Sequence, residues 1–235
     1  MSIFRIAMDG PVAAGKGTVA RLVATRLNFL YVDTGAMYRM VAYLAIENHV
    51  GFEDEDVLVK LIEKSSMHMR NPKEEEKDGR LTTVILDDED VSWKIRTEQV
   101  SAGSSKVAQF PKVRAALVKQ QQKIAQTQSV VMEGRDITFR VLPEAELKIF
   151  LTASDIVRAK RRYLELQTRG QDVDFESVYK DLLERDQRDT QRKIDPLHIT
   201  SDAWVLDTSD LAIEKVVDLI EARVKVSLEH GKKET

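Results

Sequence analysis

The chain has 235 residues, enough for one sizeable α/β domain with room for a small insert. Hydrophobic residues make up 43% and charged residues 32%, an ordinary globular balance that excludes a disordered or fibrous chain. The formal net charge is −3, so we expect no stable nucleic-acid partner, because proteins of that class usually carry a broad basic surface. The absence of cysteine excludes disulfides, thiolate nucleophiles and cysteine-ligated metals.

Membrane and export signals are missing from the pattern. No apolar run approaches the ~18 residues that a membrane span needs. The first residues enter a strand almost at once, without the basic-then-apolar layout of a secretory signal. We therefore expect a cytoplasmic protein with no membrane partner, acting as a monomer.

Strand and helix patterns alternate along the chain. Five apolar runs predict buried strands: Ile3–Met8, Phe29–Val32, Val130–Met132, Leu147–Leu151 and Ala203–Leu206. Helical periodicity follows the first, second and last of these runs, at Lys16–Leu27, Ala36–Glu47 and Leu211–Val226. This order predicts a single α/β domain over residues 1–235, with a doubly wound, five-stranded parallel sheet covered on both faces.

The segment 67–100 does not continue the alternation of strand and helix patterns. The charge run Lys73–Asp78 is interpreted as a solvated loop. The alternating stretch Arg80–Leu86 and the turn residues Asp87–Asp90 then lead to Val91–Ile95. We expect a small β-containing insert that is closed by a hairpin.

A phosphate-binding pattern, Gly10-Pro11-Val12-Ala13-Ala14-Gly15-Lys16-Gly17-Thr18, lies between the first strand and its helix. Glycines let backbone N–H groups turn toward phosphate oxygens, and the positive end of the helix points the same way. Lys16 can neutralise the β- and γ-phosphates, and the Thr18 hydroxyl can serve a phosphate or a Mg²⁺ shell. The candidate nucleotide-binding residues are Gly10, Ala13, Ala14, Gly15, Lys16, Gly17 and Thr18. The alternative is a glycine-rich turn without a ligand.

Two further charged turns follow strands at the same expected edge of the sheet. In Asp33–Arg39, Arg39 and Thr34 could bind a substrate phosphate. The alternative is that Asp33 only caps the next helix and Arg39 lies on the surface. In Glu133–Asp136, Arg135 and Asp136 would project over the crevice, or else pair with each other in a salt bridge.

Two helical segments carry clustered arginines. Arg158, Arg161 and Arg162 share one face, and Arg185, Arg188, Asp189 and Arg192 repeat that spacing. Like charges at this spacing repel, and an anionic ligand would turn the repulsion into attraction. Segment 155–171, with the turn at Thr168–Asp172, therefore predicts a helical lid; a solvated basic face is the alternative.

These motifs, in this order from Ile6 to about Val217, resemble the bacterial-type cytidylate kinases of the nucleoside monophosphate kinase family. The resemblance rests on the Gly10–Thr18 loop, on Asp33–Arg39, on Ser105 with Pro111–Arg114, on Gly134–Asp136 and on Glu184–Arg192. It implies a P-loop kinase that transfers the γ-phosphoryl group of ATP, with Mg²⁺, to CMP or dCMP. No asparagine-lysine-x-aspartate motif of the kind that reads guanine is present, which weighs against a GTPase.

The resemblance also implies roles for individual residues. Arg39, Arg135 and Arg185 would hold the acceptor phosphate, Asp189 the ribose, and Ser105, Arg114 and Asp136 the cytosine edge. Arg192 would serve the phosphates or the closed state, Arg158 and Arg161 the ATP lid, and segment 67–100 the acceptor. Lys16, Arg135, Arg185 and Arg188 are the candidate catalytic residues. No side chain is assigned as a direct metal ligand, and Mg²⁺ would come with ATP, near Thr18 or Asp33.

The chain departs from the family pattern at several positions. Val12-Ala13 replaces Ser-Gly, Glu133 replaces Asp, Thr138-Phe139-Arg140 replaces Gly-Thr-Val, and Thr34 replaces Ser. None of these changes removes a charge needed for phosphoryl transfer. Two alternatives stay open: another small P-loop kinase acting on UMP, AMP or a metabolite, and a nucleotide-dependent RNA-binding or regulatory module.

Overall fold

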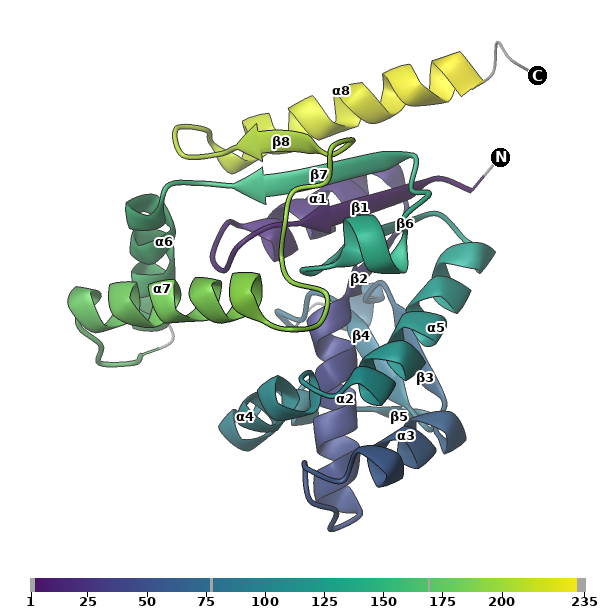
Figure 1. Ribbon diagram of the computed structural model, residues 1–235. Helices are drawn as coiled ribbons and strands as arrows, with labels where there is room; N and C mark the ends of the chain where they lie inside the picture. Colours follow the sequence, from purple (N-terminus) through teal and green to yellow (C-terminus); the bar gives the residue numbers. More distant parts are fainter. Residues whose placement is uncertain (1–2, 77, 169, 232–235) are drawn as a thin grey trace. The chain divides into compact units, whose positions relative to one another are not determined.

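The computed structural model describes residues 3–76, 78–168 and 170–231 (Figure 1). The chain divides into two compact units, Met1–Phe4 with Phe29–Met132 and Arg5–Asn28 with Glu133–Thr235. Among the described residues, the larger sheet has five parallel strands in the order β2-β6-β1-β7-β8, which confirms the doubly wound α/β fold. Its strands are β1 (Arg5–Asp9), β2 (Leu30–Asp33), β6 (Val130–Glu133), β7 (Leu147–Thr152) and β8 (Trp204–Asp207).

Each of these strands ends one residue beyond the apolar run that predicted it. The added residue is polar in every case: Asp9, Asp33, Glu133, Thr152 and Asp207. An apolar pattern reports side chains packed in the core, whereas a strand continues for as long as its backbone hydrogen bonds do. The carboxyl edge of the sheet is therefore lined with polar side chains, as a ligand-binding edge requires.

The unit Arg5–Asn28 with Glu133–Thr235 contains the phosphate-binding pattern. Strand β1 pairs in parallel with β7, with Ile6 opposite Leu147, and β7 pairs in parallel with β8. The helical elements of this unit are α1 (Lys16–Leu27), η3 (Ile137–Val141, a π-helical turn), α6 (Asp155–Thr168), α7 (Phe175–Gln191) and α8 (Ile213–Gly231). Helix α1 packs against α8, and α6 packs against α7 (Figure 1). Arg169, inside the segment predicted as a lid, lies outside the described residues.

The other unit holds four helices in its described residues: α2 (Thr34–Glu47), α3 (Glu55–Lys64), α4 (Glu98–Val107) and α5 (Pro111–Thr127). Helix α2 packs on α4, and α3 packs on α5. Helix α2 begins two residues before its predicted start, because the Asp33 carboxylate accepts a hydrogen bond from the Ala36 amide at 3.2 Å and caps the helix. No helix in the described part of the chain is both long and apolar enough to cross a bilayer.

A separate antiparallel sheet forms within segment 67–100, from β3 (Met67–Arg70), β4 (Thr83–Leu86) and β5 (Glu89–Asp90). Short helical turns η1 (Glu74–Glu76) and η2 (Lys94–Arg96) accompany it. Asp87 and Asp88 both have positive φ, at 49° and 69°, so they form the two-residue connection of the expected hairpin. Val91–Ile95 is not a strand; its end residues Val91 and Ile95 are buried, and η2 begins at Lys94.

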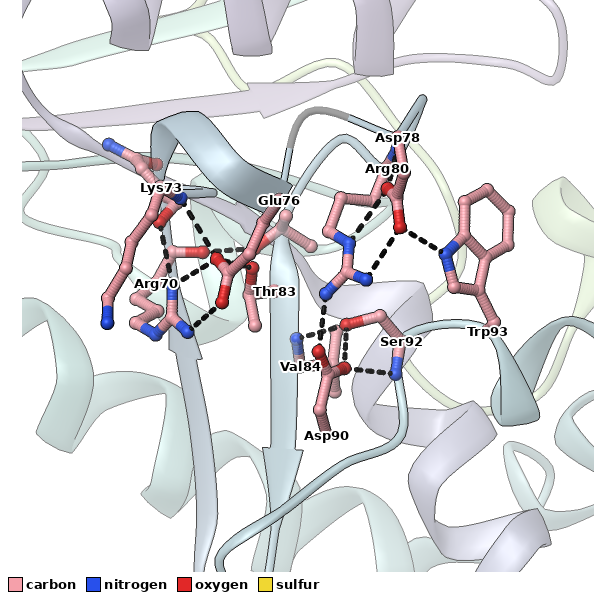
Figure 2. A network of polar contacts seen from close by, with 12 residues as sticks. Arg70, Lys73, Glu76, Asp78, Arg80, Thr83, Val84, Asp90, Ser92 and Trp93 are labelled. Atoms are coloured by element: carbon pink, nitrogen blue, oxygen red, sulfur yellow. Dashed lines mark hydrogen bonds and ion pairs between the residues drawn. The ribbon is translucent and has the colours of Figure 1, made fainter.

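Two clusters of charged side chains hold this small sheet together (Figure 2). Glu76 accepts hydrogen bonds from both terminal nitrogens of Arg70, at 2.6 and 2.5 Å, and from the Thr83 hydroxyl at 3.0 Å. Arg80 pairs with both Asp78 and Asp90. Within the run Lys73–Asp78, interpreted as a solvated loop, Asp78 is exposed and Glu76 is partly buried, and both also form ion pairs that hold the segment together.

Candidate functional site

The phosphate-binding pattern forms a loop whose backbone is forced into unusual angles. Gly10 has φ 152°, and a Cβ there would lie 2.0 Å from the Leu151 carbonyl oxygen, so only glycine fits. Ala13 and Gly15 also have positive φ, at 57° and 88°. Helix α1 begins at Lys16, with its free N–H groups facing back toward the loop. This geometry supplies several amides to one anion.

Lys16 is the cation of the loop. It is 5% exposed, and its Nζ donates a hydrogen bond to the Pro11 carbonyl oxygen at 2.7 Å. Burial, followed by the nearby charge of Arg135, lowers the Lys16 pKa to about 7, although the carboxylates of Glu133, Asp9 and Asp189 work in the opposite direction. A phosphate group beside Lys16 would restore its full positive charge.

A cavity of about 250 Å³ adjoins the loop. It is lined by Gly15 and Thr18, by Arg161 and Arg162 from α6, and by apolar residues that include Ile213 and Val216. Arg161 is held by Thr208, donating to its carbonyl oxygen at 2.7 Å and to its hydroxyl at 3.0 Å. An apolar wall beside cations and free amides suits a nucleotide, whose base is flat and apolar-faced and whose phosphates are anionic.

The described residues contain no group of three or more histidine and acidic side chains placed to hold a metal ion. Mg²⁺ is usually bound by one or two protein oxygens together with phosphate oxygens. The hydroxyl of Thr18, an exposed residue that lines the cavity, can supply such an oxygen. The residues present therefore fit an ion that is carried by nucleotide phosphates.

The turn after β6 carries the next charges. Arg135 Nε lies 2.7 Å from Asp189 Oδ2 on α7, so the internal Arg135–Asp136 salt bridge considered for this turn is replaced by a pair with α7. Asp136 is 7% exposed, and the Arg192 guanidinium lies 3.8 Å from its carboxylate. Arg192, just beyond α7, also donates from Nε to the Asp195 carbonyl oxygen at 2.6 Å.

Asp9, the last residue of β1, is hydrogen-bonded to the residues that follow this turn. Its carboxylate accepts hydrogen bonds from the amides of Ile137 and Thr138, at 3.0 and 2.8 Å, and from the Thr138 hydroxyl at 2.7 Å. Asp9 is fully buried, and burial raises the pKa of its carboxyl group. These bonds tie the strand that leads into the phosphate loop to the residues that follow Asp136.

The arginines of α6 and α7 do not share one environment. Arg158 is 3% exposed and is surrounded by protein acceptors. Arg161 faces the cavity, and Arg162 pairs with Glu165 at 2.9 Å. Arg185 and Arg188 are exposed on α7. The three arginines on α6 therefore differ in their partners, although Arg161 and Arg162 both line the cavity.

The remaining candidate residues belong to the other unit. Arg39 donates to Asp33 at 2.7 Å, and Thr34 is buried at the start of α2. Arg114 is 3% exposed, with its guanidinium 5.8 Å from the centre of the Tyr38 ring. Ser105 is exposed on α4. The assembly of these residues with Arg135, Asp136, Arg185, Asp189 and Arg192 around one acceptor stays a prediction.

Sequence reasoning missed three residues of the phosphate-loop region: Asp9, Asp186 and Thr208. Asp9 had a signal, because a charged residue that closes an apolar strand directly before a glycine-rich loop is unusual. Asp186 lies inside the Glu184–Arg192 motif, but the helical spacing in that motif marks the arginines and gives no signal for Asp186. Thr208 follows β8 and had no distinguishing signal.

Comparison with known proteins gives a consistent result. A family model described as cytidylate kinase matches residues 6–226. A cytidylate kinase of Carboxydothermus hydrogenoformans is 47% identical over 213 residues, covering 91% of this chain and 93% of the relative. One of Bacillus subtilis is 42% identical over 215 residues, covering 92% and 93%. A solved structure of an uncharacterised protein from Eubacterium ventriosum has a TM-score of 0.54 at 11% identity, covering 94% of this chain and 98% of that one, which bears on the fold alone.

Proposed function

The chain belongs to the cytidylate kinase family, and we propose that it transfers the γ-phosphoryl group of ATP to CMP or dCMP, giving ADP and CDP or dCDP. The observation that carries the proposal is the charge grouping around the phosphate loop. Buried Lys16, the Arg135–Asp189 pair and the cavity beside Thr18 all lie in one unit of the chain. Phosphoryl transfer needs positioning and charge neutralisation more than covalent help, and this chain has no cysteine nucleophile to offer.

The donor side of the reaction is assigned to the phosphate loop. The loop amides and Lys16 would hold the β- and γ-phosphates, and Arg161 and Arg162 would line the nucleotide cavity. Mg²⁺, held by the phosphates and Thr18, would supply further charge neutralisation. Closure of the helices α6 and α7 would exclude water, since water in an open site would take the phosphoryl group in place of the acceptor, giving ADP and inorganic phosphate.

The acceptor side is assigned by the family resemblance. Arg39, Arg135 and Arg185 would bind the CMP phosphate, Asp189 the ribose hydroxyls, and Ser105, Arg114 and Asp136 the cytosine edge. Arg188 would stabilise charge that develops in the transition state, and Arg192 would serve the phosphates or the closed state. The support for these roles lies in the sequence motifs, in the charges of Arg135 and Asp189, which act on Lys16, and in the Arg192–Asp136 pair, all within one unit of the chain.

ADP release measured with CMP, dCMP, UMP and AMP, each with and without Mg²⁺, tests the proposal. We expect turnover with CMP and dCMP that depends on Mg²⁺, and we expect its loss in Lys16→Ala with the fold intact by circular dichroism. A preference for AMP, UMP or a metabolite would assign the chain to another kinase activity. Tight RNA binding without CMP turnover would favour a regulatory module instead. Light scattering tests the monomer that we propose for the active form.

A further inference from the structure

Two helices bind the backbone of a single residue in the phosphate loop. The Val12 amide donates a hydrogen bond to Asp186 Oδ1 on α7 at 3.2 Å. The Val12 carbonyl oxygen accepts one from Arg158 Nη1 on α6 at 2.9 Å. Both polar backbone groups of Val12 are therefore hydrogen-bonded to side chains, and these side chains come from different helices.

The two gripping side chains also bind each other, which closes the arrangement into a ring. Arg158 Nη1 lies 2.5 Å from Asp186 Oδ2. The other nitrogens of Arg158 are engaged too, with Nε donating to the Ala153 carbonyl oxygen at 3.0 Å and Nη2 lying 2.5 Å from Asp155. We call the Val12 backbone with Arg158 and Asp186 the Val12 clamp.

The burial of Arg158 shows that the clamp is a built structure. The residue is 3% exposed, and two carboxylates together with backbone oxygens replace the water that its charge would need. A guanidinium held in this way is not available to turn toward a nucleotide without breaking several charge-assisted hydrogen bonds. Its location argues for a role that is exerted on the loop.

Resting on the proposed function, we propose that Arg158 and Asp186 are positioning residues, which fix the phosphate loop at Val12 and so couple helices α6 and α7 to donor-nucleotide binding. The family resemblance placed Arg158 among the residues that contact ATP. The geometry points instead to an action through the loop backbone.

The physical reason lies in the strain of the loop. Val12 stands between Gly10, at φ 152°, and Ala13, at φ 57°, so the surrounding chain samples other conformations readily when it is not held. Amides that are already aimed at their ligand bind it more tightly, because no ordering has to accompany binding. The clamp contacts only the backbone of Val12. The side chain at this position can therefore be valine here and serine in the family that the sequence resembles.

Binding of ATP without an acceptor measures the effect directly, by calorimetry. Asp186→Asn keeps an oxygen for the Val12 amide but loses the charge that faces Arg158, so we expect Kd for ATP to rise about threefold. Asp186→Ala removes both contacts, and we expect a rise of about tenfold, equivalent to 1.4 kcal/mol. Asp181→Asn is the matched control, since Asp181 is an exposed aspartate on the same helix, and we expect its Kd to equal that of the unmodified protein.

Hydrogen exchange of the Val12 amide, followed by NMR, gives a second readout that does not depend on nucleotide. We expect faster exchange at Val12 in both Asp186 variants and no change in Asp181→Asn. A lowered melting temperature with ATP affinity within twofold of the unmodified protein would overturn the proposal, because Asp186 would then serve only the stability of the fold. If Asp186→Ala does not fold, Asp186→Asn alone decides. The proposal is then overturned if this variant leaves both the hydrogen exchange of the Val12 amide and the Kd for ATP unchanged.

These outcomes are separable from a failure of the proposed function. If the unmodified protein binds ATP but does not phosphorylate CMP, the kinase assignment fails, while the clamp is still tested by binding and exchange. If CMP is phosphorylated normally but ATP affinity ignores Asp186, only the clamp fails.

Discussion

Arg135 Nε lies 2.7 Å from Asp189 Oδ2, and this ion pair joins the turn after β6 to helix α7. The two residues are 54 positions apart in sequence. The Arg135 pKa is raised: burial, the largest single cause, acts to lower it, but the charge and hydrogen bond of Asp189, together with the charges of Glu133 and Asp9, outweigh burial, so the guanidinium keeps its proton. The pair orients the cation that the proposed function assigns to the acceptor phosphate.

Removal of Asp189 should therefore weaken acceptor binding. In Asp189→Ala the Arg135 guanidinium loses its charged partner, and a lost hydrogen bond to a charged group is worth about 1.5–3 kcal/mol. We expect KM for CMP to rise by at least about tenfold, from that range of energies, with a much smaller change in KM for ATP. Steady-state kinetics with each substrate varied in turn measures both values. Equal increases for CMP and ATP would contradict a role confined to the acceptor.

Lys16 should take up a proton when the nucleotide binds at alkaline pH. Its pKa of about 7 in the free protein means that it is mostly neutral at pH 8.5. Phosphate oxygens beside Nζ favour the charged form, so binding raises this pKa and draws a proton from the buffer. Calorimetry in buffers of different ionisation enthalpy should detect an uptake that approaches one proton at pH 8.5 and falls below pH 7. In Lys16→Arg, whose side chain stays charged, the uptake should disappear; if it persists, another group takes up the proton.

Ala13 carries backbone strain that glycine would relieve. Its φ of 57° costs a residue other than glycine about 1–2 kcal/mol, whereas glycine adopts that angle freely. Glycine also makes the unfolded chain more flexible, and this lowers the free energy of unfolding by about 0.4–1 kcal/mol. We expect Ala13→Gly to be neutral or to stabilise the protein by about 1 kcal/mol in urea unfolding. Ala14→Gly is the control, since Ala14 is not among the residues with positive φ, and it should destabilise. Ala13→Val should be the worst of the three, because a branched side chain tolerates this region poorly.

The small antiparallel sheet should loosen in acid. The pKa of Glu76 lies well below the usual range for a glutamate, because its carboxylate accepts hydrogen bonds first from Arg70 and then from the Lys73 amide. A lowered pKa means that this stabilisation is complete above the unfolded pKa of about 4.3 and is lost as the pH falls further. Trp93 donates to Asp78 at 2.8 Å in the segments that flank this sheet, so its fluorescence, in a Trp204→Phe background, reports the change.

The comparison of two neighbouring glutamates sharpens that experiment. Glu76→Gln should show the loosened Trp93 signal already at pH 7, whereas Glu75→Gln, at an exposed position, should titrate like the unmodified protein. Identical titrations for both variants would mean that the Arg70–Glu76 contact does not hold the sheet.

The sequence predicted the fold well where local pattern decides it. Helix α1 has its predicted bounds, Lys16–Leu27, because a glycine-rich loop before it and Asn28 at φ 54° after it mark both ends. The turn predicted at Asp87–Asp90 is shorter than expected, because Glu89 and Asp90 pair with β4 as strand β5. A hydrogen-bonded ladder depends on a partner strand, which the run itself does not encode.

The candidate site was predictable in its residue types and not in their contacts. The loop glycines and Lys16 could be named from their spacing, since that spacing between a strand and a helix is typical of a phosphate loop. The Val12–Asp186 bond spans 174 positions, and the Asp9–Ile137 bond spans 128. No periodicity connects residues that far apart, so the division of the arginines between loop support and cavity lining emerges only from tertiary packing.

The polar network of Figure 2 joins residues that lie between positions 70 and 93, so each of its bonds is made and broken inside one short stretch of chain. Because these bonds do not depend on residues elsewhere in the chain, a substitution that removes one of them should first change the shape of this segment.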